Sequence, residues 1–182
     1  MATSSSSTAS AKASQALAVV VMGVSGAGKT VVGRRLAEAL GADFIDGDDL
    51  HTDAARAKMA SGHPLTDDDR WPWLDRIAAA LREGVSRGVT TIVACSALRR
   101  VYRERLRIGA AGGLRFIYLR ADRDLMRARV AGRRDHYMPA SLVDSQFATL
   151  EPPDGEPDVV VMPADAELDA AIPKLAAELK VR

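Results

Sequence analysis

Short apolar runs alternate with stretches of helical spacing along most of the chain. Runs rich in β-branched and aromatic residues, typical of buried strands, occupy residues 17–22, 43–46, 89–95, 114–119 and 159–162. Between them, apolar residues recur every three or four positions, which predicts helices over residues 30–40, 73–87, 97–108, 122–130 and 166–179. This alternation indicates an α/β fold in which right-handed crossovers join the strands of a parallel sheet.

Two stretches, residues 49–70 and 131–146, do not fit the alternation. In this fold class, insertions tend to lie above the carboxyl ends of the strands, where ligands bind. No linker divides the chain further, so we expect a single domain over residues 17–182. Residues 1–16 are rich in Ser and Ala and are predicted to form a disordered tail. A transit peptide is the alternative, although the tail carries one basic residue, Lys12.

Composition and charge narrow the class of protein. The chain has 182 residues, of which 47% are hydrophobic, and Lys plus Arg number 25 against 24 for Asp plus Glu. This balance produces no global field that would attract nucleic acid or anionic lipid. Cys95 is the single cysteine, which excludes an intrachain disulfide, and no apolar stretch approaches the ~20 residues that span a bilayer. We therefore expect a cytoplasmic protein without a nucleic-acid or membrane partner.

The most specific local signal is GVSGAGKT, residues 23–30, which lies between a predicted strand and a predicted helix. It matches the phosphate-loop pattern, in which glycines let backbone N–H groups turn onto phosphate oxygens beside a helix N-terminus. Lys29 would reach the β- and γ-phosphates, and the Thr30 hydroxyl would bind Mg²⁺. The candidate nucleotide-binding residues of the loop are Gly23, Ser25, Gly26, Ala27, Gly28, Lys29 and Thr30.

Motors, switches and kinases all use such a loop, so other residues must distinguish among them. A guanine-reading N-K-x-D element is missing from the sequence, and the third predicted strand ends in Ala-Cys-Ser rather than Asp-Glu. The chain is also short for a motor ATPase. These features favour a small-molecule kinase.

The motif DGDDLH, residues 46–51, follows the second predicted strand directly. Phosphoryl transfer to an alcohol needs a group that orients the hydroxyl and accepts its proton, and Asp48 is the candidate. Asp46 would hold Mg²⁺ through a water molecule. The alternative is a polar turn in which Asp49 caps a helix.

Residues 58–73 contain three side chains that could bind an anionic substrate, Lys58, His63 and Arg70. His63 is expected to be exposed or structural. The acidic run at residues 66–69 is better explained by capping and solvation than by chemistry, with Pro72 opening the helix that follows.

The third predicted strand leads into CSALRRVYR, residues 95–103. Ser96 could face the substrate, and Arg99 could hold a carboxylate through two parallel hydrogen bonds. Cys95 is expected to be a small buried residue. Five arginines, Arg99, Arg100, Arg103, Arg105 and Arg107, raise the alternatives of RNA contact and a solvated helix face.

A second basic segment lies at residues 127–138. Arginines there, with Arg129, Arg133 and Arg134 as candidates, could close over ATP and neutralise charge on the transferring group. The alternative is an exposed basic helix end.

Together these motifs resemble the gluconokinase (gluconate kinase) family of small P-loop kinases. The resemblance rests on MGVSGAGKT, DGDDLH, KMASGHPLTDDDRWPWL, CSALRRVYR, FIYL and GRRDHYM, which occur in the family's order between about residues 19 and 150. It implies a three-layer, nucleoside-monophosphate-kinase-like fold with a five-stranded parallel sheet and a mobile lid at about residues 131–140. It also implies ATP- and Mg²⁺-dependent phosphorylation of D-gluconate to 6-phosphogluconate, often by a homodimer.

The resemblance also implies roles for individual residues. Asp48 resembles the acceptor-side base, and the gluconate-side groups are His51, Lys58, Arg70 and Arg99. Arg129 resembles an arginine that stacks on adenine, with Pro163 across the slot, and Arg133 resembles a lid arginine that reaches the phosphates.

Two other functions stay open at this stage. Shikimate kinases are related, but they place a Gly-Gly-Gly turn where this chain has Ala94-Cys95-Ser96. A nucleotide-dependent regulatory or RNA-binding protein would bind ATP without acceptor-dependent turnover and would bind RNA in a salt-sensitive way.

Overall fold

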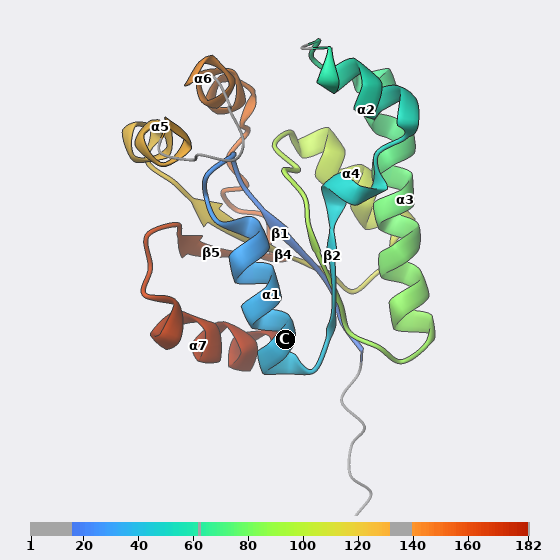
Figure 1. Ribbon diagram of the computed structural model, residues 1–182. Coiled ribbons are helices and arrows are strands. Elements are labelled where there is room, and N and C mark those ends of the chain that lie inside the picture. The colour runs from blue at the N-terminus through green and yellow to red at the C-terminus, as the bar shows by residue number, and fades with distance from the viewer. Residues whose placement is uncertain (1–15, 62, 132–139, 182) are drawn as a thin grey trace, which may run out of the picture.

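The computed structural model describes residues 16–61, 63–131 and 140–181. Its centre is a parallel sheet of five strands in the order β2-β3-β1-β4-β5 (Figure 1). The strands are β1 (Ala18–Met22), β2 (Asp43–Asp46), β3 (Thr91–Ala94), β4 (Leu114–Arg120) and β5 (Val159–Pro163). The α/β fold, the parallel sheet and its five strands confirm the sequence prediction.

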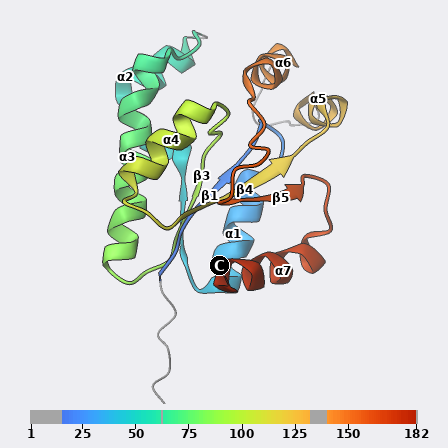
Figure 2. The same cartoon turned by 180° about the vertical axis from the view of Figure 1, so that it is seen from behind.

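Helices cover both faces of this sheet. They are α1 (Lys29–Leu40), α2 (Asp53–Ala60), α3 (Asp67–Ser86), α4 (Arg100–Gly109), α5 (Arg123–Ala131), α6 (Ala140–Thr149) and α7 (Leu168–Val181), with a 3₁₀ turn η1 (Gly47–Leu50) after β2. Helices α1 and α7 pack together on one face, and α3 and α4 on the other (Figure 2). Within the described residues, no helix is long and apolar enough to cross a bilayer.

The alternation of side chains along β1 explains the two halves of the core. Val19 and Val21 belong to the cluster that includes α1 and α7, whereas Val20 and Met22 belong to the cluster that includes α3 and α4. Successive residues of a strand point to opposite faces, so a continuous apolar run is required where both faces are covered. The buried central strand therefore holds the three layers together.

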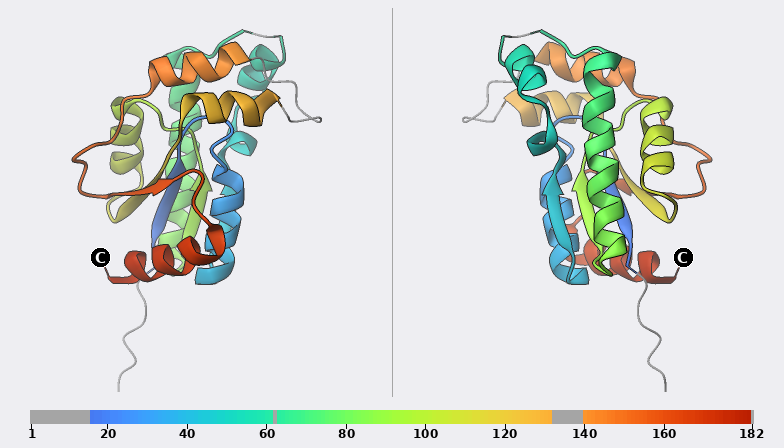
Figure 3. Two further views of the ribbon diagram at one scale, coloured as in Figure 1. Left: turned by 90° about the vertical axis from the view of Figure 1, so that its left-hand side faces the viewer. Right: turned by 90° about the vertical axis from the view of Figure 1, so that its right-hand side faces the viewer.

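The carboxyl ends of the strands all meet at one edge of the sheet, because every strand is parallel. Helices α2, α5 and α6 lie over this edge, as the side views show (Figure 3). The phosphate loop, η1 and the segment between β3 and α4 also begin there. This edge is where the sequence analysis expects ligands.

Two predicted helix starts are wrong. Helix α3 begins at Asp67 rather than residue 73, because Thr66 and Asp69 form a reciprocal capping box, and Pro72 lies inside the helix instead of opening it. Helix α4 begins at Arg100 rather than residue 97, since Ala97 has a φ of 44° and cannot continue a right-handed helix.

The two stretches that break the alternation contain the short helices α2 and α6. Thr52 caps α2 by accepting a hydrogen bond from the Ala55 N–H, and Asp49 lies within η1, so the prediction of Asp49 as a helix cap is wrong. Residues 1–15 of the predicted tail and 132–139 of the predicted lid, including Arg133 and Arg134, lie outside the described residues.

Candidate active site

The phosphate loop joins β1 to α1 and depends on its glycines. Gly23 has a φ of 144°, and a Cβ atom there would lie 3.0 Å from the carbonyl oxygen of Leu119. Gly28, with a φ of 93°, is the cap residue of α1. Backbone N–H groups at this helix start are therefore turned toward the mouth of the loop, where an anion is stabilised.

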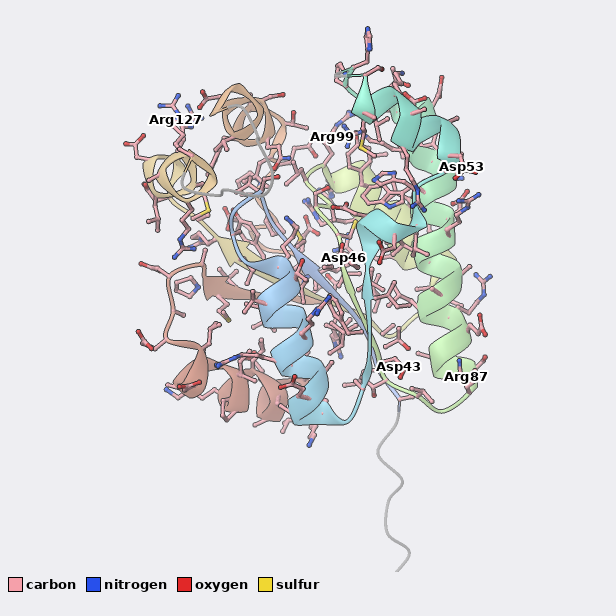
Figure 4. All side chains as sticks on the ribbon, viewed as in Figure 1. Asp43, Asp46, Asp53, Arg87, Arg99 and Arg127 are labelled. Atoms are coloured by element: carbon pink, nitrogen blue, oxygen red, sulfur yellow. The ribbon has the colours of Figure 1, made fainter. Side chains whose placement is uncertain are left out.

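Lys29 and Thr30 form the first turn of α1. Lys29 Nζ donates to the carbonyl oxygen of Val24, 3.1 Å away across the loop. Thr30 Oγ1 donates to Asp46 Oδ2 at 3.0 Å, so the loop and the end of β2 are in direct contact. Figure 4 shows Asp46 at the end of β2 that faces the site, and Asp43 at the opposite end.

The Thr30–Asp46 pair has the oxygen donors that Mg²⁺ prefers. Magnesium is usually held by one or two carboxylate or hydroxyl oxygens, substrate phosphates and water. Over residues 16–61, 63–131 and 140–181, no group of three or more His, Cys, Asp or Glu side chains is arranged to hold a metal alone. The pair therefore fits an ion shared with a nucleotide better than an all-protein metal site.

The turn η1 presents Asp48 at the carboxyl edge of the sheet. Gly47 is tightly packed, because a Cβ atom would lie 2.4 Å from the carbonyl oxygen of Ala94. Trp73 Nε1 donates to the Gly47 carbonyl oxygen at 2.6 Å. These contacts hold the backbone of the turn, while the Asp48 side chain is 90% exposed and open to an acceptor.

His51 lies behind Asp48. Its side chain is only 5% exposed, and its ring stacks on Trp73 with centroids 4.3 Å apart. Burial lowers the pKa of His51, against the opposing effect of Asp48, and Arg70 and Arg56 lower it further. His51 Nε2 lies 3.9 Å from Asp48 Oδ1, and Nδ1 has no hydrogen-bond partner among the described residues. The lowered pKa favours a neutral His51 ring, which lies next to the candidate base Asp48.

The predicted substrate cations come together beside α3. Lys58 from α2 pairs with Asp69, and Arg99 before α4 pairs with Asp67, with 2.6 Å between Arg99 NH1 and Asp67 Oδ2. Arg70 donates to the carbonyl oxygen of Leu65 at 3.2 Å. The structure thus brings positive groups from α2, α3 and the segment before α4 together at the start of α3.

The acidic run of α3 does more than cap the helix. Asp67 accepts hydrogen bonds from the Tyr102 hydroxyl and from Arg99, which lower its pKa. Lys58 and the capping residue Thr66 together lower the pKa of Asp69 to about 2. The capping box at Asp69 agrees with the prediction of capping, and the ion pairs of Asp67 with Arg99 and of Asp69 with Lys58 are a further role that was not predicted.

Ser96 follows β3 at the same edge and is half-buried. Its carbonyl oxygen accepts a hydrogen bond from the Gly23 N–H at 3.3 Å, which joins the acceptor-side segment to the phosphate loop. The neighbouring Cys95 is buried, and desolvation raises its pKa to about 12. This agrees with the prediction of a small buried residue rather than a nucleophile.

A cavity of about 230 Å³ lies beside the loop and the first turns of α1. It is lined by Ala27, Gly28, Val31, Val32, Arg129, Ala164, Asp165, Ala166 and Leu168. Arg129 NH1 donates to the Ala164 carbonyl oxygen at 3.0 Å, so α5 is tied to the segment after β5. Apolar walls with a planar guanidinium suit an aromatic base. Pro163, which the resemblance places across the adenine slot, is the last residue of β5 and does not line this cavity. The three residues that follow it, Ala164, Asp165 and Ala166, line the cavity instead.

The arginines of α4 are paired with carboxylates. Arg103 is fully buried, binds Glu156 through two nitrogens and donates to the carbonyl oxygens of Ala97 and Leu98. The other pairs are Arg99–Asp67, Arg100–Glu104, Arg105–Asp75, Arg107–Glu156 and Arg107–Asp158. These carboxylates offset the positive charge of the arginine cluster, and the alternative of a solvated face is wrong for Arg103, which is buried.

One polar residue at the site was not predicted from the sequence. Gln146 of α6 accepts from the Ser25 N–H at 2.6 Å and donates to Ser25 Oγ at 2.9 Å. No local pattern marks Gln146, because its partner is 121 residues away and α6 has weak apolar periodicity.

Comparisons with known proteins agree with this geometry. A family model described as an AAA domain matches residues 19–153. The gluconokinase of Gluconobacter oxydans is 43% identical over 157 residues, which cover 86% of this chain and 88% of the relative.

Two solved structures are similar over nearly the whole chain. A gluconokinase from Sinorhizobium meliloti is 44% identical with a TM-score of 0.78, covering 91% of this chain and 92% of its own. A sugar kinase from a Janibacter species is 38% identical with a TM-score of 0.83, covering 91% and 95%. The gluconokinases among these relatives match the chain at 43–44% identity over most of its length, and its phosphate loop and acidic turn meet at one sheet edge. The chain therefore belongs to the gluconokinase family.

Proposed function

We propose that this protein transfers the γ-phosphoryl group of ATP to D-gluconate, releasing ADP and 6-phosphogluconate. The observation that carries the proposal is the meeting of the phosphate loop, the Thr30–Asp46 pair and Asp48 at one edge of the sheet, together with the cations that pair with the start of α3. The names of the relatives favour gluconate as the acceptor.

The donor side is formed by the loop and the adjoining cavity. The N–H groups of residues 26–30 bind phosphate oxygens, Lys29 reaches the β- and γ-phosphates, and Arg129 lies against the adenine. Thr30 and Asp46 would hold Mg²⁺, directly and through water, and the ion would neutralise charge on the phosphates. Arg133 is proposed as the lid arginine that reaches the transferring group.

The acceptor side uses Asp48 as the base. The terminal hydroxyl oxygen of gluconate attacks the γ-phosphorus, its proton passes to Asp48, and the bond from the γ-phosphorus to the bridging oxygen breaks to release ADP. The gluconate carboxylate binds among Lys58, Arg70 and Arg99, and Ser96 contacts the hydroxyl row. The buried His51 ring lies on the protein side of Asp48, with Nε2 3.9 Å from Oδ1, and supports the carboxylate there.

The first experiment is an ADP-release assay with Mg-ATP and a panel of acceptors: D-gluconate, shikimate, glycerate, adenosine phosphosulfate and none. Turnover with gluconate alone is the expected result. Turnover with a different acceptor would overturn the substrate while keeping the kinase. ATP binding without acceptor-dependent ADP would point to a regulatory protein. A cytoplasmic location and a homodimer are further proposals, and light scattering after gel filtration tests the dimer.

A further inference from the structure

Residues 146–151, the last turn of α6 and the two residues after it, contact both sides of the candidate active site. Its first residue, Gln146, binds Ser25 of the phosphate loop through two hydrogen bonds. Its last residue, Glu151, binds the acceptor-side segment before α4. Helix α6 lies over the carboxyl edge of the sheet (Figure 3).

The Gln146 contact is reciprocal. The side-chain oxygen accepts from the Ser25 N–H at 2.6 Å, while the side-chain nitrogen donates to Ser25 Oγ at 2.9 Å. A carboxamide carries an acceptor and two donors on one planar group, so it can serve both atoms of Ser25 at once. The contact therefore fixes the backbone and the side chain of this loop residue together.

The Glu151 contact holds the other side. The Glu151 N–H donates to the Leu98 carbonyl oxygen at 2.9 Å, and Glu151 Oε2 accepts from the Arg100 N–H at 2.6 Å. Helix α4 has no side-chain cap of its own at Arg99, so Glu151 supplies the missing acceptor at its first turn. Glu151 Oε1 also lies 3.8 Å from Arg99 Nε.

Ser25 lies on the arm of the loop that rises from β1. The same arm begins at Gly23, whose N–H donates to the Ser96 carbonyl oxygen of the acceptor-side segment. The opposite arm leads through Gly28 into α1, whose N-terminus carries the phosphate-binding donors. Gln146 therefore meets the loop on its acceptor-facing arm, away from the N-terminus of α1.

We propose that Gln146 is a positioning residue for phosphoryl transfer, which fixes the phosphate loop relative to the acceptor-side segment through the last turn of α6 and Glu151. This inference rests on the proposed kinase function. In-line transfer requires reacting atoms about 3–3.5 Å apart, and a misplacement of about 1 Å can cost a hundredfold in rate. A group that sets the spacing affects the transfer step more than nucleotide binding, because the N–H donors of residues 26–30 are unchanged.

The test compares Gln146→Ala with wild type in steady-state kinetics and in ADP binding by calorimetry. We expect kcat to fall by about tenfold or more, while the Kd for ADP and the KM for ATP stay within about threefold. Gln146→Asn, which keeps the carboxamide on a shorter stem, is expected to lose as much kcat as the alanine variant. Ser145→Ala, at an exposed neighbour on the same helix, is the matched control and is expected to keep wild-type kcat.

A double variant asks whether Gln146 acts through Ser25. We expect kcat of Ser25→Ala/Gln146→Ala to be no lower than that of Gln146→Ala alone. Gln146→Ala already breaks both hydrogen bonds to Ser25, whereas Ser25→Ala removes only the bond to Oγ. Multiplied losses, an unchanged kcat for Gln146→Ala, or a Kd for ADP raised more than tenfold would each overturn the proposal.

Wild-type assays separate this inference from the proposed function. If wild type phosphorylates another acceptor in the panel, the gluconate assignment fails, and the kcat comparison is made with that acceptor. If wild type binds ATP but phosphorylates none, the positioning role falls with the kinase function.

Discussion

Asp48 and His51 are three residues apart, yet one side chain is almost fully exposed and the other almost fully buried. The 3₁₀ turn that contains Asp48, packed through Gly47 against Ala94, leaves the carboxylate in solvent and is followed by His51, whose ring stacks on Trp73. An exposed carboxylate on a tightly packed turn suits a catalytic base, because the side chain can reach a substrate while its backbone is held in place.

Asp48→Asn tests the base directly. We expect kcat to fall by about 10²–10⁴-fold while ADP binding is unchanged, because an amide keeps the shape of the side chain but cannot accept the proton. Steady-state kinetics with gluconate and ADP calorimetry measure the two effects. Asp49→Asn, at the exposed neighbouring residue, is the matched control. An equal loss in the control would remove Asp48 from the role of base.

His51 makes stability depend on pH. Its pKa in the folded protein lies below the ordinary 6.5 because of burial, so just below pH 6.5 the unfolded chain binds a proton that the folded chain does not. The free energy of unfolding should therefore fall as pH drops through 6.5, and should level off below the pKa of the folded protein.

His51→Phe removes this titration while keeping a ring against Trp73, so we expect a flatter pH dependence of unfolding. Urea unfolding at pH values on both sides of 6.5 measures the slope. His63→Phe is the control at an exposed histidine and should keep the wild-type slope. An unchanged slope in His51→Phe would assign the pH dependence to other groups.

At the scale of elements, α4 is joined to the loop before β5 by a buried ion pair. Arg103, with 1% of its side chain exposed, pairs with Glu156 and also donates to two carbonyl oxygens of the acceptor-side segment. Those bonds hold Ala97 in its unusual conformation, with a φ of 44°. The pair therefore supports the segment that carries Ser96 and Arg99.

Arg103→Met should destabilise the fold by about 3 kcal/mol, because it removes one partner of a buried charge pair and the donor to the Ala97 carbonyl oxygen. The loss is at the low end for a broken buried pair, because Glu156 keeps Arg107 and the Leu98 carbonyl oxygen keeps the Glu151 N–H. Urea unfolding at neutral pH measures this loss. Arg100→Met on the same helix breaks only a largely exposed pair with Glu104, and we expect little change. Equal effects of the two changes would contradict the distinction between buried and surface pairs.

At the scale of the whole molecule, the site is assembled by the parallel sheet. The phosphate loop, η1, α3, the β3–α4 segment and α6 approach the same edge, although their residues are spread over more than 120 positions. The two ends of one strand accordingly differ in role. Asp46 at the carboxyl end of β2 touches Thr30, whereas Asp43 lies at the far end (Figure 4).

This polarity predicts a difference between two matched changes in β2. Asp46→Asn should raise the free Mg²⁺ concentration needed for half-maximal activity by about 10–100-fold, because the carboxylate proposed to hold the ion through water, and to orient Thr30, is lost. Asp43→Asn, at the exposed opposite end, should leave it unchanged. Mg²⁺ titrations of ADP release measure both. A wild-type Mg²⁺ requirement in Asp46→Asn would exclude Asp46 from the ion site.

Much of this architecture is predictable because its signals are local. Apolar runs mark strands, three- and four-residue spacing marks most helices, and the glycines of residues 23–30 mark a phosphate loop whose backbone conformation few other residues adopt. The predicted start of α3 is wrong because Pro72 is a strong local signal for the first residue of a helix. The Thr66–Asp69 capping box instead starts the helix at Asp67.

The sequence by itself determined the fold class, the phosphate loop and the placement of Asp46 and Asp48 after a strand, because each depends on neighbours within a few residues. Only the tertiary structure decided the strand order, the pairing of Lys58 and Arg99 with aspartates of α3, the burial of Arg103 and the contact of Gln146 with Ser25. These join residues 11 to 121 positions apart. Which distant groups meet is set by how the sheet brings its carboxyl ends together, and no local pattern records it.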